Sequence, residues 1–439
     1  MDRFTDDTRF SDYSADTYEQ KPAMDYSLEN ELRKTIQRQK KTIFSLAERN
    51  RVWKIICFVL VVLLVIESVL LWVNSNEDTP HIPDASQVQT GQGEIAEQPS
   101  VEVPPSHPVN EERIEEILSQ MTLVDKIHQM MFVTPEELTG FESVTAAGES
   151  TEASLAERKV GGIIYNDTNI EGAEQLTSML TNTADYAVTP VFLGYRRNSG
   201  SIISGEGFEL QSQTVIGTYS EKNKIAEEYA ACAEEMASFG FNVNFGTSTE
   251  LVSGSGSGVV GSFGSDVTAV SDAVSMAVKG QLMHNVSAAL GAFPTDTNEQ
   301  HTAEQLRSSE FVVYKSGIDS GADFVTVSHK VNTALDGEGV PYSMSKGVVT
   351  ELLCGELAFD GIVITAPMTE LEYTDELTCG QAAAKCIKAG VNMIMNPVDF
   401  EETVIYINEA VRVGELDVSL IDNSVRRILR VKQKRGLIK

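Results

Sequence analysis

The sequence predicts an α/β fold, a (β/α)8 barrel of the TIM type, preceded by a single transmembrane helix. Three features indicate this: a long apolar run near the N-terminus, eight short apolar runs beyond residue 109, and amphipathic helical stretches between those short runs. Of 439 residues, 42% are hydrophobic and 22% are charged, which is ordinary globular composition. The formal charge of −30 argues against nucleic acid as a partner, because phosphate binding needs clustered cations.

The long apolar run, residues 55–73, has the length that crosses a bilayer. Eight basic residues and one acid lie between Arg33 and Lys54, whereas residues 74–112 contain no Lys or Arg. The positive-inside rule therefore predicts a single-pass protein of the cell membrane, with its N-terminus in the cytoplasm and its C-terminal domain outside the cell.

These features divide the chain into four parts. The segment after the apolar run is rich in Pro, Gln, Ser and acidic residues without apolar periodicity, which is typical of a disordered linker. The predicted parts are a cytoplasmic tail with a basic juxtamembrane helix (1–54), the transmembrane helix (55–73), the linker (74–108) and the barrel (109–439).

The eight short apolar runs are the expected strands of the barrel. Each is too continuously hydrophobic to alternate between core and solvent, as parallel strands buried under helices are. Stretches such as 221–239 and 400–413 carry apolar residues at three- and four-residue spacing, which predicts helices. Eight alternating repeats favour a closed barrel, with an open doubly wound sheet as the alternative. The expected strands are Met130–Val133, Gly161–Tyr165, Val191–Leu193, Phe241–Phe245, Ala288–Phe293, Phe324–Ser328, Gly361–Thr365 and Val391–Met395.

No metal, cofactor or disulfide framework is expected. Cys57 lies in the apolar run, and the other four cysteines fall in helical stretches without CxxC spacing, so we expect buried thiols. His284 and His329 have no further ligands at zinc-site spacing. Residues 256–261 match GxGxxG formally, but they lie in a longer Ser/Gly run, which favours a flexible loop over a dinucleotide site.

In a barrel, the residues that follow each strand form the functional face. Arg196, Arg197, Asp296 and His329 occupy such positions and are candidate ligand-binding residues. The two arginines could clamp a carboxylate or phosphate, such as an anionic wall polymer. The alternative is that they form ion pairs with neighbouring acids such as Asp167.

The order of segments resembles the N-terminal domain of glycoside hydrolase family 3, which includes bacterial β-N-acetylhexosaminidases. The resemblance covers residues 111–439, essentially the whole predicted extracellular domain. Phe263 lies in one of the matching segments and joins the candidate ligand-binding residues. The segments, in the family's order, are ILSQMTLVDKIHQMMFV, GGIIY, FGFNVNFG, GSFGSD, GADFVTVSH, VPYSMS, AFDGIVIT and AGVNMIM.

The resemblance also shows which family residues this chain lacks. Family members form a covalent glycosyl intermediate on an Asp that directly follows the FxGxxxTD strand, and this position is Ala366. A methyl group cannot attack an anomeric carbon. The KHFPGH stretch corresponds to residues 291–296 without its Lys and His, the DxEGG stretch to residues 194–198 without its acids, and the Arg before SFG to Gly261.

The resemblance also implies one relic of the catalytic machinery. Glu299-Gln300-His301 resembles the Asp-Ser-His dyad that serves as general acid/base in the hexosaminidase branch, where a carboxylate orients a histidine. The alternative for His301 is a solvated loop histidine. Glu370 or Glu372 could replace the missing nucleophile, but a carboxylate displaced along the chain does not reach the position from which it could attack the sugar. The alternative is that both residues belong to a solvated acidic loop.

We therefore expect a membrane-anchored bacterial surface protein whose family-3-like barrel has lost hydrolysis and binds cell-wall glycan or a surface protein. The first alternative is an active β-N-acetylhexosaminidase-type O-glycosyl hydrolase with a relocated nucleophile. The second is a structural spacer whose function lies in the cytoplasmic tail.

Overall fold

The chain folds around a single parallel β-sheet. The computed structural model describes residues 101–252, 261–295, 301–336, 339–372 and 377–439. Within them, eight parallel strands are ordered β7-β6-β5-β4-β3-β2-β1-β8. Each predicted strand overlaps one observed strand. The strands are β1 (Met131–Val133), β2 (Gly162–Tyr165), β3 (Phe192–Tyr195), β4 (Val243–Thr247), β5 (Ser287–Phe293), β6 (Phe324–Val327), β7 (Ile362–Thr365) and β8 (Ile394–Met395).

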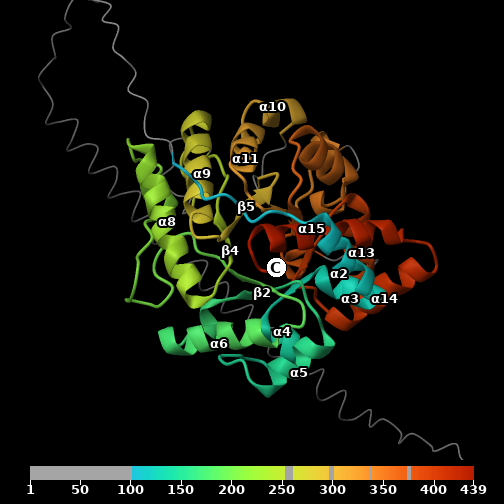
Figure 1. The fold of residues 1–439 in the computed structure, drawn as a ribbon. Helices are drawn as coiled ribbons and strands as arrows, with labels where there is room; N and C mark the ends of the chain where they lie inside the picture. The colour runs from blue at the N-terminus through green and yellow to red at the C-terminus, as the bar shows by residue number, and fades with distance from the viewer. Residues whose placement is uncertain (1–100, 253–260, 296–300, 337–338, 373–376) are drawn as a thin grey trace, which may run out of the picture. The chain divides into compact units, whose positions relative to one another are not determined.

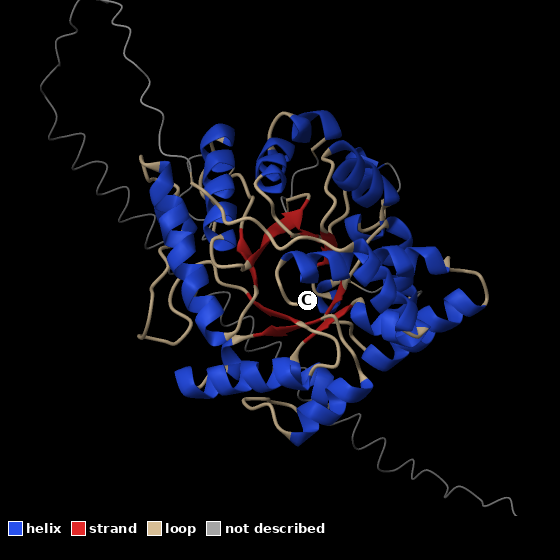
Figure 2. Ribbon diagram, viewed as in Figure 1, coloured by secondary structure: helices blue, strands red, loops and turns tan. Residues whose placement is uncertain are grey.

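The two ends of this strand order meet, so the sheet is a nearly closed barrel. Ile364 of β7 and Met393, just before β8, form a parallel bridge, and the Thr365 amide donates to the Met393 carbonyl over 3.1 Å. Figure 2 shows the strands as a ring with helices outside it. The predicted barrel is confirmed, and the doubly wound alternative is wrong, because an open sheet leaves its two edge strands apart.

Helices cover the outside of the ring (Figure 1). The helices α8 (Lys222–Phe239) and α9 (Val267–Leu282) pack closely together. A Cβ on Gly280 would lie 2.4 Å from the Ala226 carbonyl oxygen, so only glycine allows this approach. The elements between and around the strands are α2 (Glu111–Gln120), α3 (Leu123–Gln129), α4 (Pro135–Thr139), α5 (Glu149–Glu157), η1 (Asp167–Asn169), α6 (Ala173–Tyr186), α7 (Gln213–Ile216), α8 (Lys222–Phe239), α9 (Val267–Leu282), α10 (Ala303–Arg307), α11 (Glu310–Asp319), α12 (Thr333–Asp336), η2 (Tyr342–Met344), the π-helical η3 (Gly347–Glu356), η4 (Met368–Glu370), α13 (Cys379–Ala389), α14 (Phe400–Arg412) and α15 (Val418–Lys434).

The last helix, α15, closes the end of the barrel at which the strands begin. Its Arg427 donates to the carbonyl of Gly361, just before β7, over 3.0 Å. Its Lys432 donates to Gln129 Oε1, which precedes β1, over 2.8 Å. Figure 1 accordingly shows α15 and the C-terminal end over the strand ring. The opposite end, where the strands finish, is left for the functional loops.

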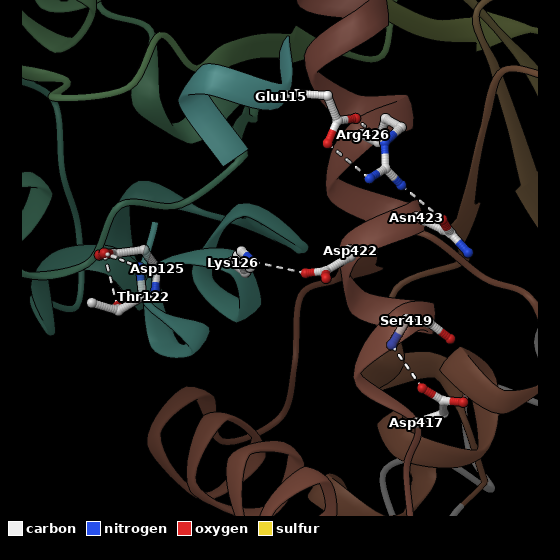
Figure 3. Close-up of polar contacts among 9 residues, drawn as sticks. All are labelled: Glu115, Thr122, Asp125, Lys126, Asp417, Ser419, Asp422, Asn423 and Arg426. Atoms are coloured by element: carbon white, nitrogen blue, oxygen red, sulfur yellow. Dashed lines mark hydrogen bonds and ion pairs between the residues drawn. The ribbon is translucent and has the colours of Figure 1, made fainter. Parts of the chain in front are cut away.

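Charged pairs join α15 to the first two helices of the domain (Figure 3). Lys126 of α3 lies 2.8 Å from Asp422, and Glu115 of α2 pairs with Arg426. These side chains are partly exposed, and pairs of this kind contribute only about 0–1 kcal/mol each. They therefore set the register of α15 on α2 and α3 rather than supply much stability.

A buried carboxylate connects the end of α15 and the residue that follows it to the sheet. Asp323, which is 1% exposed and directly precedes β6, accepts from Arg435 Nε over 2.5 Å and from Lys434 Nζ over 2.9 Å. The hydroxyl of Ser287, the first residue of β5, donates to the same carboxylate over 2.8 Å. Asp323 thus links two neighbouring strands to the C-terminal segment.

The predicted tail, transmembrane helix and most of the linker lie outside the described residues. Among the residues that the structure does describe, none of the helices has both the length and the apolarity to cross a membrane. The end of the predicted linker already touches the barrel, since Val103 packs against the core and the His107 amide donates to the Lys434 carbonyl over 3.1 Å.

The four cysteines that the structure describes are free. Cys232 and Cys386 are buried, as expected from the sequence, whereas Cys354 and Cys379 are partly exposed.

Candidate functional site

Ala366 directly follows β7 at the end of the barrel where the strands finish. Its amide donates to the Val327 carbonyl at the end of β6 over 2.8 Å, and the residue is 7% exposed. This backbone bond continues the β6–β7 pairing by one residue, which fixes the position of Ala366 at the rim. The side chain at this rim position is a methyl group, which has no polar atom for chemistry.

His329, a candidate ligand-binding residue, lies beside Ala366 but has both ring nitrogens engaged. Nε2 lies 3.1 Å from the Ala366 carbonyl oxygen and Nδ1 lies 2.8 Å from the Ser343 hydroxyl. A carbonyl only accepts, so Nε2 carries the proton and the neutral ring accepts from Ser343 at Nδ1. Burial lowers the pKa of His329, and the carbonyls of Ala366 and Pro367 partly offset this. His329 thus ties β6 to the end of β7.

We expect His329→Ala to reduce the free energy of unfolding by about 1–3 kcal/mol, because the buried Ser343 hydroxyl loses the imidazole nitrogen that accepts its hydrogen bond. Binding to a cell-wall ligand should stay unchanged. Urea unfolding measures the first effect. His284→Ala, at a partly exposed position whose ring makes no hydrogen bond to another described residue, should shift stability by less than about 0.5 kcal/mol. Intact stability together with lost ligand binding would instead make His329 a binding residue.

The two candidate replacements for the nucleophile are solvent-exposed. Glu370 ends η4 and Glu372 follows it, and both side chains are exposed. Neither has an ion pair or side-chain hydrogen bond with another described residue. This matches the alternative of a solvated acidic loop.

The relic dyad is only partly visible. Glu299 and Asp296 lie outside the described residues, so their geometry is untested. His301 is half-buried, and its carbonyl accepts from Asn332 Nδ2 over 2.8 Å. The roles of Glu299 and His301 remain predictions.

The two consecutive arginines after β3 have opposite environments. Arg197 is 1% exposed, and its guanidinium donates to Glu235 and to the carbonyls of Gly200 and Phe208. The ion-pair alternative therefore describes Arg197, with Glu235 rather than Asp167 as the acid. Arg197 therefore links the hairpin of residues 200–210 to Glu235 of α8.

Arg196, by contrast, is exposed and has no hydrogen bond or ion pair with any other described residue. Asp167 accepts instead from the Tyr195 hydroxyl over 2.5 Å. Burial, reinforced by this bond to Asp167, raises the pKa of Tyr195. Phe263, another candidate ligand-binding residue, is 4% exposed and belongs to the hydrophobic core, where its ring centroid lies 6.2 Å from that of Tyr229.

A polar groove of about 730 Å³ lies between the loops that follow β2 and β3. Arg196 is the one cationic residue among those that line it. The lining residues are Asp167, Ile170, Glu171, Gly172, Tyr195, Arg196, Asn198, Ser199, Ser201, Ile202, Ile203, Ser204 and Glu206. The sequence did not single out this groove, since residues 198–206 read as an ordinary polar loop.

Glu137 is a second feature that the sequence analysis missed. It lies in the first turn of α4, just past β1, and its Oε2 accepts from the Thr134 amide over 3.0 Å. Burial raises the pKa of Glu137 to about 7, so the carboxyl holds a proton over part of the neutral range. The signal was the capping box formed by Thr134 and Glu137, which indicates a helix start but not burial.

A (β/α)8 barrel whose functional residues lie on the loops that follow its strands is the architecture of a large class of enzymes and their relatives. Residues 121–431 match the family described as "Glycosyl hydrolase family 3 N terminal domain". The chain therefore belongs to this family, and the resemblance inferred from the sequence is confirmed.

Curated relatives of similar sequence include two proteins named as hexosaminidases. "Beta-hexosaminidase A" of Pseudoalteromonas piscicida is 24% identical over 320 residues, which are 63% of this chain and 53% of that protein. "Beta-hexosaminidase" of Stenotrophomonas maltophilia is 25% identical over 227 residues, 47% of this chain and 67% of that protein. The chain thus spans about half the length of the first of these relatives.

Solved structures show the same fold. The glycoside hydrolase family 3 β-N-acetylglucosaminidase from Paenibacillus superposes with a TM-score of 0.66 at 24% identity, over 72% of this chain and 63% of that chain. The β-N-acetylhexosaminidase from Beutenbergia cavernae gives a TM-score of 0.62 at 19% identity, over 71% and 98%.

Proposed function

We propose that this chain is a membrane-anchored family 3 protein that binds at the bacterial cell wall and does not hydrolyse glycosides. The observation that carries the proposal is Ala366, the residue at the position of the family's nucleophile. A retaining glycosidase needs a carboxylate about 5 Å from its acid/base group, on the opposite side of the glycosidic bond. A methyl group neither attacks carbon nor stabilises positive charge.

The surroundings of Ala366 support the proposal. His329 spends both ring nitrogens on Ser343 and on the backbone, so it has no lone pair or proton to offer a substrate. Glu370 and Glu372 are exposed, and a carboxylate displaced by even about 1 Å can lose on the order of a hundredfold in rate. Residues 55–73 supply the proposed anchor.

The competing function is hydrolysis through another carboxylate. Glu137 favours it, because a carboxyl with a pKa of about 7 on the functional side of the barrel has the protonation behaviour of a general acid. A general acid without a nucleophile, however, lacks the group that forms the glycosyl intermediate.

Incubation of the full-length, detergent-solubilised chain with a chromogenic β-N-acetylglucosaminide and with muropeptides tests the proposal. We expect chromophore and sugar to be released only at the uncatalysed rate. We also expect the chain to co-sediment with insoluble cell-wall polymer. Turnover that disappears in His301→Ala, Glu370→Gln or Glu137→Gln would establish the hydrolase instead. A chain that neither hydrolyses nor sediments with the wall would contradict the binding role and favour the spacer alternative.

A further inference from the structure

We propose that the groove between the β2 and β3 loops binds a short zwitterionic peptide, with Arg196 holding its carboxylate and the acidic residues of the groove holding its ammonium group. This inference rests on the proposed binding role and adds the class of ligand. The groove's volume, about 730 Å³, is within the range of sites that enclose small ligands.

The charges of the groove select a ligand that carries both signs. Arg196 is exposed and has no partner among the described residues, and the carboxylates of Glu171 and Glu206 are equally free of described partners while lining the same groove. A purely anionic ligand would meet an excess of carboxylates, and a purely cationic ligand would meet the guanidinium. A peptide with one carboxylate and at least one amine matches both.

The shape of the groove is fixed before a ligand arrives. One wall is the hairpin in which Gly200 and Leu210 exchange two backbone hydrogen bonds of 2.8 and 2.9 Å. The buried Arg197 holds this hairpin through the Gly200 carbonyl and through Glu235. On the other wall, the Tyr195 hydroxyl fixes the carboxylate of Asp167. Such preorganisation lowers the entropy that binding would otherwise cost.

The uncharged lining favours a peptide over a sugar ring. Ser199, Ser201 and Asn198 offer donors and acceptors for peptide groups, and three isoleucines offer small apolar contacts. Sugar rings usually lie on exposed aromatic faces. Tyr195 is the single aromatic residue of the lining, is 7% exposed and stacks on Phe241 with centroids 5.3 Å apart.

Calorimetric titration of the full-length chain tests this with the tripeptide Ala-Lys-Ala bearing free termini. We expect saturable binding, at least about tenfold weaker binding of its C-terminal amide, and a similar loss for the free acid with Arg196→Gln. The amide should bind wild type and Arg196→Gln equally, which assigns the carboxylate to Arg196. Replacing Lys by norleucine should weaken binding to wild type but not to Glu206→Gln.

The matched control is Arg412→Gln, which removes another exposed guanidinium, on α14 away from the groove, and should leave affinity unchanged. Absence of saturable binding up to about 5 mM peptide, equal affinity for acid and amide, or an unaffected Arg196→Gln variant would each overturn the inference. So would Arg196-dependent binding of chitotriose without peptide binding. If Arg196→Gln still co-sediments with the cell wall, the proposed function is supported even without peptide binding. Turnover of glycosides would contradict the proposed function, whether or not the peptide binds.

Discussion

Asp323→Ala is expected to lower the free energy of unfolding by about 3–5 kcal/mol, because it leaves Arg435 buried at 7% exposure without its carboxylate. The change also removes the acceptor of Ser287 and the partner of Lys434. Urea unfolding at neutral pH measures the loss. Asp319→Ala is the matched control, since Asp319 is 60% exposed and pairs with the exposed Lys315, and its effect should stay below about 0.5 kcal/mol.

The same carboxylate should make the fold sensitive to acid. Burial alone would raise the pKa of Asp323, but Arg435 and Lys434 outweigh burial and hold the pKa below its usual value. A lowered folded pKa means that the stability contributed by Asp323 is complete above the unfolded pKa of about 4 and is lost as pH falls through the folded value. The difference in free energy of unfolding between wild type and Asp323→Ala should therefore become smaller below about pH 4. A gap independent of pH, or one as small as that of Asp319→Ala, would contradict this account.

Lys432→Met, in contrast to Asp323→Ala, is expected to raise the free energy of unfolding at neutral pH. Lys432 is fully buried, donates to Gln129 and lies 5.2 Å from the centre of the Phe192 ring, and no carboxylate of the described residues pairs with it. Burial lowers its pKa to about 7. Between about pH 7 and the unfolded pKa of about 10.4, the unfolded chain binds a proton that the folded chain does not, so wild-type stability rises with pH.

The methionine variant lacks this rise but leaves Gln129 Oε1 without a donor, which costs about 1–3 kcal/mol. We expect the variant to be more stable than wild type near pH 6 and less stable near pH 10, with the difference changing by up to about 4 kcal/mol over that range. Urea unfolding at five pH values measures it. Lys388→Met, which removes an exposed lysine paired with Glu415, should show no such crossing. Parallel pH curves for Lys432→Met and wild type would mean that Lys432 stays charged in the fold.

The sequence predicts the barrel well because parallel strands buried on both faces must be continuously apolar. All eight strands could be located from continuous apolar runs in the sequence, since β2 and β6, for example, are buried along their whole length. The contacts that close the barrel could not be found this way. Asp323 and Arg435 are separated by 112 residues, and nothing local in either segment indicates the pair.

The site was harder to predict, for a reason that Arg196 and Arg197 illustrate. Consecutive side chains at a strand end point in opposite directions, so one arginine is buried under the hairpin and the other faces the groove. Which of the two is buried depends on register, and the sequence pattern does not fix the register of a loop. His329 was placed correctly at the rim, but its bonds to Ser343 and Ala366 depend on neighbours distant in sequence.

We propose that the alanine at residue 366 leaves the barrel without a carboxylate able to attack a sugar. Intact-mass spectrometry of the full-length chain after incubation with a 5-fluoro-N-acetylglucosaminyl fluoride, which traps glycosyl-enzyme intermediates, tests it most directly. We expect an unchanged mass under conditions in which a family member with an aspartate at this position gains one sugar. A single fluorosugar adduct on this chain, mapped to any carboxylate, would contradict it.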